Sequence, residues 1–138
     1  MPVRSADATW SGDLKSGEGQ MMTESGAYDG EFTFATRFGD EAGTNPEELL
    51  AAAHGGCFSM AFANEVSEAG YTVEEVNTHA EITLEDGEIV RSHLVMDAKI
   101  PEIDEEAFHE IAEQAHDGCP VSSALGAIPE LTLDATLQ

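Results

Sequence analysis

The chain has 138 residues, and 28 acidic side chains against five lysines and arginines give it a formal net charge of −23. This length suits one hydrophobic core, so we expect a single domain over residues 1–138. Five cations cannot form a basic face, which excludes nucleic acid as a ligand. The sequence has no apolar run long enough to cross a membrane and no apolar leader, so we expect a cytoplasmic protein without membrane contact.

The acidic residues are spread along the whole chain and form no terminal tail. This distribution favours a halophilic surface, adapted to a salt-rich cytoplasm, over an acidic patch for a basic partner. Salt that shortens the Debye length to a few Å makes such self-repulsion tolerable. We therefore expect the protein to lose stability at low salt.

The N-terminal part of the chain predicts three strands joined by short turns. In the third of them, Phe32, Phe34 and Phe38 fall on one face with a period of two. The three segments together predict an antiparallel meander. The expected strands are 6–10, 20–24 and 31–38.

The stretch TNPEELLAAAHGGCFSMAFANEVSEAG, residues 44–70, predicts one long helix. Asn45 suits the N-cap and Pro46 the first helical position, while Gly70 supplies the C-terminal stop. Because the helix has almost no charged residue beyond its first turn, we expect it to be buried. One chain of this length cannot cover such a helix on all sides, so we predict a homodimer.

The rest of the chain predicts a hairpin, two helices and a last strand. Glu85-Asp86-Gly87 is the hairpin signal, Asp104 caps the first helix, and Cys119-Pro120 opens the second. The order β-β-β-α-β-β-α-α-β predicts an α+β fold in which two antiparallel meanders flank the central helix that carries Cys57. The expected elements are strands 73–84 and 88–100, helices 105–116 and 121–125, and strand 130–137.

Two cysteines, Cys57 and Cys119, are the candidate reactive groups. A static disulfide is disfavoured in a reducing cytoplasm, so a catalytic or redox-sensing pair is the better interpretation. Cys119 follows a glycine at a helix N-terminus, where a thiol reacts well. Cys57 lies in mid-helix among apolar residues, where burial raises its pKa, so it needs a cation beside it to become a thiolate.

Arg37 is the candidate cation by elimination, because it ends a strand just before the loop that leads into the cysteine helix. A buried arginine needs a carboxylate, and Glu47 and Glu48 are the nearest in sequence. Ten residues of straight helix, however, separate Glu47 from Cys57 by about 15 Å. Either the helix bends at Gly55-Gly56, or a partner subunit supplies one of the groups.

Other functions stay open from these residues alone. The thiols could serve a non-enzymatic redox sensor or a hydrophobic small-molecule-binding stress protein, or they could be inert in a structural protein. His54 and Cys57 lie three positions apart on one helix face and could share a metal, but two such ligands are a weak signal and a packed histidine is favoured. We expect neither a metal nor a cofactor. The absence of a CxxC motif disfavours a general disulfide reductase.

Five sequence blocks resemble the osmotically inducible protein C branch of the OsmC/Ohr family of organic hydroperoxide reductases. The resemblance implies an intertwined α+β homodimer with two active sites at the interface. It also implies a thiol-dependent peroxidase for oxidative and osmotic stress defence. The blocks are TRF at 36–38, GTNPEELLAAAH at 43–54, GCFSMA at 56–61, EAGYT at 68–72 and GCPVSSAL at 118–125.

The resemblance also implies a role for each site residue. Cys57 would be the peroxidatic cysteine and become a sulfenic acid, and Cys119 would resolve it as a disulfide. Arg37 and Glu47 would orient the peroxide and activate the thiolate. The reductant would be a dithiol, such as a lipoylated protein, or another small thiol. Apolar surroundings favour organic hydroperoxides over hydrogen peroxide, and they include Phe32, Phe34, Phe58 and Met60.

Overall fold

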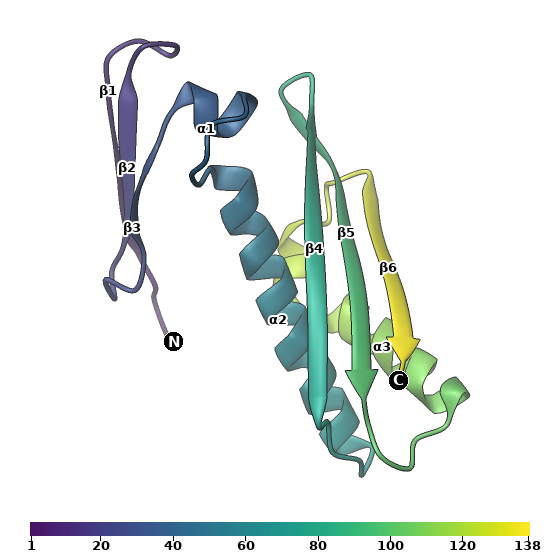
Figure 1. The fold of residues 1–138 in the computed structure, drawn as a ribbon. Coiled ribbons are helices and arrows are strands. Elements are labelled where there is room, and N and C mark those ends of the chain that lie inside the picture. The colour runs from purple at the N-terminus through teal and green to yellow at the C-terminus, as the bar shows by residue number, and fades with distance from the viewer. The chain divides into compact units, whose positions relative to one another are not determined.

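The order of helices and strands follows the prediction, with one extra helix. The structure, a computed structural model, describes residues 1–138 and divides into two units, Met1–Leu49 and Leu50–Gln138. The single domain expected over the chain stays a prediction. The elements in Figure 1 are β1 (Ala6–Ser11), β2 (Glu18–Thr23), β3 (Asp29–Phe32), α1 (Phe34–Phe38), α2 (Pro46–Glu68), β4 (Glu75–Glu85), β5 (Glu88–Lys99), α3 (Glu105–Gly118), α4 (Pro120–Ala124) and β6 (Glu130–Leu137).

The first unit contains the predicted antiparallel meander, in the order β1-β2-β3. The predicted strand 31–38 is wrong in its second half, which forms α1. Thr33 and Thr36 form a capping box: the N–H of Thr33 donates to the hydroxyl oxygen of Thr36 at 2.9 Å, and the N–H of Thr36 donates to that of Thr33 at 3.2 Å. Phe34 and Phe38 are four residues apart, and their ring centres lie 5.0 Å from each other. Residues four apart share a face in a helix as well as in a strand, so this spacing fits both elements.

The N-terminus of α2 is capped as predicted. The Asn45 side chain accepts a hydrogen bond from the N–H of Glu48 at 2.8 Å and donates to the carbonyl of Thr36 at 2.9 Å. The helix is continuous from Pro46 to Glu68, through Gly55-Gly56. These bonds attach the start of α2 to the end of α1.

The second unit contains a three-stranded mixed sheet in the order β4-β5-β6. Asp86 and Gly87 both have positive φ, 52° and 79°, which suits a two-residue hairpin turn between β4 and β5. The expected second antiparallel meander is wrong in its third strand, because β6 pairs parallel to β5. The chain crosses from β5 to β6 through α3 and α4, and a crossover of this kind allows the two strands to run parallel. The residue pattern of β6 is the same for a parallel and an antiparallel strand, so the sequence alone did not distinguish the two arrangements.

The core of the second unit lies between one face of β5 and the helices α2 and α3 (Figure 1). The rings of Phe58 and Phe62 from α2 and Phe108 from α3 are fully buried, and Phe62 meets Phe108 edge to face at 5.7 Å. Full burial of each ring stabilises the fold by about 1.5–3 kcal/mol. Strand β5 completes the core with Leu94, Met96 and Ala98.

Helix α2 is buried on one face only, so the expectation of a helix buried all round is not met by one chain. Its opposite face presents small or apolar side chains, and Met60 is 76% exposed. Gly55 packs on β4, where an added Cβ would lie 3.6 Å from the Cβ of Ala80. The exposed α2 face comprises Ala52, Ala53, Gly56, Met60 and Asn64. None of the helices combines the length and the apolar character needed to cross a membrane.

Candidate active site

The two cysteines meet inside the second unit. Cys57 lies in the middle of α2, and Cys119 lies at the turn between α3 and α4, where its N–H donates to the carbonyl of Ala115 at 2.9 Å. Their Sγ atoms are 3.0 Å apart, so one thiol proton can be shared between them. Both thiols are free. Cys57 is partly exposed and Cys119 is fully buried.

The surroundings of the two sulfurs shift their pKa values in opposite directions. Burial raises the pKa of Cys57, and the contact with Cys119 raises it further. Burial alone would raise the pKa of Cys119 too, but hydrogen bonds from Cys57, from the N–H and hydroxyl of Ser122, and from the N–H of Val121 lower it overall. Within the second unit, a negative charge on the pair is therefore better accommodated on Cys119.

No unpaired cation is available to Cys57 within the second unit. Arg91 and Lys99, its only basic residues besides histidine, pair with Glu130 at 3.5 Å and Glu74 at 3.6 Å on the exposed side of the sheet. No positive charge of Leu50–Gln138 therefore offsets the raised pKa of Cys57, although the N–H of Val121 lowers that pKa in part.

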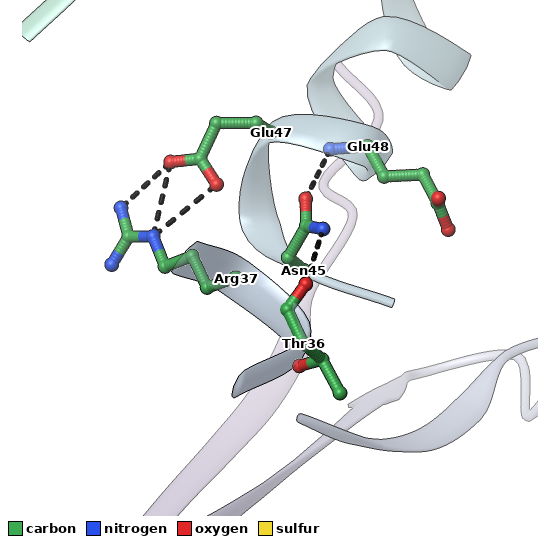
Figure 2. Close-up of polar contacts among 5 residues, drawn as sticks. All are labelled: Thr36, Arg37, Asn45, Glu47 and Glu48. Carbon is green, nitrogen blue, oxygen red and sulfur yellow. Dashed lines mark hydrogen bonds and ion pairs between the residues drawn. The ribbon is translucent and has the colours of Figure 1, made fainter. Parts of the chain in front are cut away.

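Arg37 and Glu47 form the predicted ion pair in the first unit. Figure 2 shows the guanidinium of Arg37 facing the carboxylate of Glu47, with Nη2 to Oε1 at 2.7 Å and Nε to the two oxygens at 3.1 and 3.2 Å. The side chain of Glu47 is 11% exposed and that of Arg37 37%. Such a fork fixes both position and orientation of the guanidinium. Glu48, the other nearby carboxylate, accepts from Thr44 instead.

An aromatic cavity of about 170 Å³ adjoins Arg37 in the first unit. The rings of Trp10 and Phe32 pack on each other in its lining, with their centres 5.5 Å apart. The guanidinium carbon of Arg37 lies 5.1 Å from the centre of the Phe38 ring. The hydrogen bonds and the ion pair of Arg37 involve Nε and Nη2, which leaves the remaining guanidinium nitrogen, Nη1, free to donate. An apolar wall beside a free N–H donor suits a ligand with an alkyl body and an oxygen-bearing end.

His54 is a buried hydrogen-bonded residue, as the favoured interpretation of the sequence held. Its Nδ1 lies 2.7 Å from the hydroxyl of Ser92 on β5, and its Nε2 lies 2.7 Å from the hydroxyl of Ser122 on α4. Both ring nitrogens are thus occupied and neither is free to bind a metal. No group of three or more His, Cys, Asp or Glu side chains is arranged to hold a metal ion.

Each of the two predicted pairs is thus found within one unit: Cys57 with Cys119, and Arg37 with Glu47. Sequence reasoning missed Ser92 and Ser122 as partners of His54. The signal that could have found Ser122 is its place three residues after Cys119 on the same short helix. Ser92 gave a weaker signal, as a polar residue at a core-facing position of β5.

Comparison with known proteins gives the class to which this fold belongs. Solved structures of OsmC/Ohr proteins share the fold. One from Elizabethkingia anophelis, an organic hydroperoxide resistance protein, is similar with a TM-score of 0.71 and 23% identity over 99% of this chain and 97% of that one. An OsmC-like protein from Mycoplasma pneumoniae gives a TM-score of 0.77 at 12% identity, over 99% and 97%.

Sequence comparison places the chain within this class. The profile of the OsmC-like protein family matches residues 39–134. Peroxiredoxin OsmC of Escherichia coli (strain K12) is 41% identical over 140 residues, which cover 98% of this chain and 96% of that protein. An organic hydroperoxide resistance protein-like 1 of Staphylococcus saprophyticus is 28% identical over 86% of this chain and 87% of its own. The chain belongs to the OsmC-like protein family.

Proposed function

We propose that the protein is a thiol-dependent peroxidase that reduces organic hydroperoxides to alcohols, in defence against oxidative or osmotic stress. The observation that carries the proposal is the pair of sulfurs 3.0 Å apart, one partly exposed and one buried. A peroxide can reach Cys57 from solvent, whereas the fully buried Cys119 can reach only Cys57. The names of the relatives, peroxiredoxin and organic hydroperoxide resistance protein, support the same chemistry.

The reaction proceeds in two steps at this pair. The Cys57 thiolate attacks the outer oxygen of ROOH, so an S–O bond forms, the O–O bond breaks, and the alkoxide takes up a proton and leaves as ROH. The Cys119 thiolate then attacks the Cys57 sulfur. An S–S bond forms, the S–O bond breaks, and hydroxide leaves and is protonated to water. An external dithiol, such as a lipoylated protein, reduces the disulfide by exchange.

The thiolate of Cys57 needs a positive charge beside it, and in this proposal the guanidinium of Arg37, held in position by Glu47, supplies it. Helix α2 continues without a break through Gly55-Gly56, which favours the shared site over the bent helix, the other alternative considered from the sequence. We infer that the pair comes from a second copy of the chain, which leaves one active site per subunit in a homodimer. The uncharged, exposed α2 face supports this assembly, because it resembles a surface that another subunit covers.

The aromatic cavity beside Arg37 defines the substrate preference within the proposal. Its apolar wall accepts the alkyl group of a hydroperoxide, while the unoccupied Nη1 of Arg37 donates to a peroxide oxygen. Hydrogen peroxide has no alkyl group and gains nothing from this wall. Organic hydroperoxides are therefore the better substrates.

A peroxidase assay with the cysteine variants tests the proposal. At high salt, the wild-type protein should reduce a cumene-type hydroperoxide faster than hydrogen peroxide, with dihydrolipoamide as a better reductant than a monothiol. Cys57→Ser should abolish turnover, and Cys119→Ser should stop after one oxidation with a trapped sulfenic acid on Cys57. Multiple turnovers by Cys57→Ser would contradict the mechanism at the cysteine pair.

Two further outcomes separate the proposal from its alternatives. Oxidation of Cys57 without continued turnover in the presence of a dithiol would indicate a redox sensor rather than an enzyme. Sedimentation that shows a folded monomer at micromolar concentration would contradict the homodimer and the shared site.

A further inference from the structure

Two bridges connect one turn of α2 to the start of α4. Cys57 and Cys119 form the first bridge, with their sulfurs 3.0 Å apart. The second joins Nε2 of His54 to the hydroxyl of Ser122 at 2.7 Å. His54 precedes Cys57 by three residues, and Ser122 follows Cys119 by three residues. Because residues three apart share one face of a helix, the two bridges lie side by side between the same two turns.

The bridge at His54 is anchored in the core of the second unit. Nδ1 of His54 lies 2.7 Å from the hydroxyl of Ser92 on β5, so the imidazole connects α4 to the sheet. A neutral imidazole donates from one nitrogen and accepts at the other, and each serine hydroxyl can take either role. His54 and Ser92 are fully inaccessible to solvent and Ser122 is 5% exposed, so water does not compete for these bonds.

Helix α4 has few other attachments to the core. It spans five residues, too few for a stable helix alone, and Ser122 is its one buried side chain, beside a partly buried Val121. The N–H of Cys119 donates to the carbonyl of Ala115 at 2.9 Å, and the carbonyl of Cys119 accepts from the N–H of Ser123 at 3.0 Å. The backbone from Cys119 to Ser123 is thus one closed turn. The position of the Ser122 hydroxyl therefore determines where the Cys119 sulfur lies.

We propose that His54 and Ser122 are positioning residues that hold the Cys119 thiol beside Cys57 and raise its effective concentration for disulfide formation. The proposal rests on the peroxidase function above and concerns its second step. The two residues act through the backbone of α4, so they need no contact with the Cys119 sulfur and take part in no bond that forms or breaks. The chemistry of the step stays the same: the S–S bond forms, the S–O bond of Cys57 breaks, and hydroxide leaves.

The bridge at His54 matters more in the reduced protein than in the oxidised one. In the oxidised protein the disulfide itself keeps α4 beside α2. In the reduced protein no covalent bond does so, and loss of the His54–Ser122 hydrogen bond lets α4 occupy positions in which the sulfurs are apart. Disulfide formation must then remove this freedom, which costs conformational entropy. The disulfide therefore becomes easier to reduce when the bridge is removed.

The redox equilibrium of the cysteine pair tests the proposal without a peroxide. The protein is incubated with mixtures of reduced and oxidised dithiothreitol, and its free thiols are counted by alkylation after acid quenching. In the reductive direction one dithiothreitol sulfur attacks Cys57 and Cys119 leaves; the second dithiothreitol sulfur then closes the ring and releases Cys57. Because one hydrogen bond changes an equilibrium constant by roughly three- to tenfold, Ser122→Ala should lower the constant for disulfide formation by about this factor. The reduction potential then rises by about 15–30 mV.

Ser123→Ala is the matched control, because Ser123 lies next to Ser122 on α4 but is exposed. It should keep the wild-type reduction potential. A general loss of stability changes the folded reduced and folded oxidised proteins alike and leaves the potential unchanged. Equal potentials in Ser122→Ala and Ser123→Ala would therefore overturn the proposal.

Hydrogen exchange gives a second measurement of the position of α4. The N–H groups of Ser123 and Leu125 donate to the carbonyls of Cys119 and Val121 at 3.0 and 2.9 Å. In reduced Ser122→Ala both N–H groups should exchange faster than in the reduced wild type, and formation of the disulfide should restore their protection. Equal acceleration in the reduced and oxidised forms would show that α4 is loosened without regard to the cysteine pair, and would overturn the proposal.

Failure of this proposal and failure of the proposed function give different results, because neither measurement uses a hydroperoxide. If the protein is no peroxidase, wild-type turnover is absent while the difference in potential between Ser122→Ala and Ser123→Ala persists. If the bridge does not position Cys119, turnover persists while the two variants have the same potential. Where both proposals hold, Ser122→Ala forms its disulfide about three- to tenfold more slowly after one equivalent of hydroperoxide, and the sulfenic acid accumulates.

Discussion

Replacing Glu47 by glutamine removes the charge that orients Arg37 while nearly preserving the shape of the side chain. The carboxylate accepts three N–H contacts, two at Oε1 and one at Oε2. A glutamine oxygen in the place of Oε1 can keep the first two, but its NH₂ group then faces the N–H of Nε, donor against donor. The guanidinium must turn away, and the Nη1 proposed to bind the peroxide turns with it.

The size of the expected effect follows from the exposure of the pair. Hydrogen bonds to charged groups contribute about 1.5–3 kcal/mol, but Arg37 is 37% exposed and water screens part of this. Taking about 1–2 kcal/mol of lost transition-state stabilisation, kcat/KM for an organic hydroperoxide should fall about five- to thirtyfold in Glu47→Gln. Glu47→Asp keeps the charge but withdraws it by about 1.5 Å, which breaks the same contacts. It should be impaired to a similar degree.

Steady-state kinetics with a dithiol reductant measure these effects, and Glu130→Gln serves as the control. Glu130 pairs with Arg91 through a single 3.5 Å contact and is 64% exposed, so its neutralisation should leave kcat/KM unchanged. Wild-type kcat/KM in Glu47→Gln would refute the assignment of Glu47. An impaired Glu47→Gln beside a fully active Glu47→Asp would show that charge matters and orientation does not.

The remaining predictions concern pH, packing and salt. Because burial raises the pKa of Cys57 and Arg37 is proposed to offset this, Arg37→Ala should slow sulfenic acid formation at neutral pH. Its rate should keep rising into the alkaline range where the wild-type rate has levelled off; identical pH–rate profiles would contradict this. Phe62→Ala should lower the free energy of unfolding by about 3–5 kcal/mol in denaturant titrations, and Val95→Ala, at a position 42% exposed, by less than about 1 kcal/mol. The thermal midpoint should rise with added salt, because screening weakens the repulsion within a net charge of −23; a midpoint independent of salt would argue against the halophilic interpretation.

The parts of the fold that local chemistry determines were predictable from the sequence. The turn at Asp86-Gly87 requires two positive φ angles, and the sequence offers residues suited to them. Asn45 and Asp104 cap their helices through side-chain bonds to N–H groups three residues ahead, which the spacing already indicated. The alternation along β4 also matches its half-buried and exposed sides.

The prediction failed where one residue spacing fits both a helix and a strand, and where the direction of a strand depends on a connection between distant parts of the chain. Phe34 and Phe38 satisfy both a strand period and a helical spacing, and the reciprocal bonds of Thr33 and Thr36 favour the helix. The direction of β6 depends on the crossover that precedes it, which no pattern within β6 records.

The candidate site shows the same division. Family resemblance brought Cys57, Cys119, Arg37 and Glu47 together as candidates, and the structure places them as two contacting pairs. The partners of His54 are 38 and 68 residues away in sequence, so periodicity could not identify them. Only the packing of α2 against β5 and α4 brings them into contact.

The separation of the two cysteines along the chain affects the thermodynamics of the proposed disulfide. A bond between residues 62 positions apart closes a long loop, which stabilises the folded chain by about 4 kcal/mol through the entropy of the unfolded state. Because folding and disulfide formation are thermodynamically linked, the fold stabilises the disulfide by the same amount. The reduction potential of the disulfide is therefore about 90 mV lower in the folded chain than in the unfolded chain. The proposed disulfide therefore requires a more strongly reducing partner, and a dithiol that closes its own ring on oxidation meets this requirement better than a monothiol.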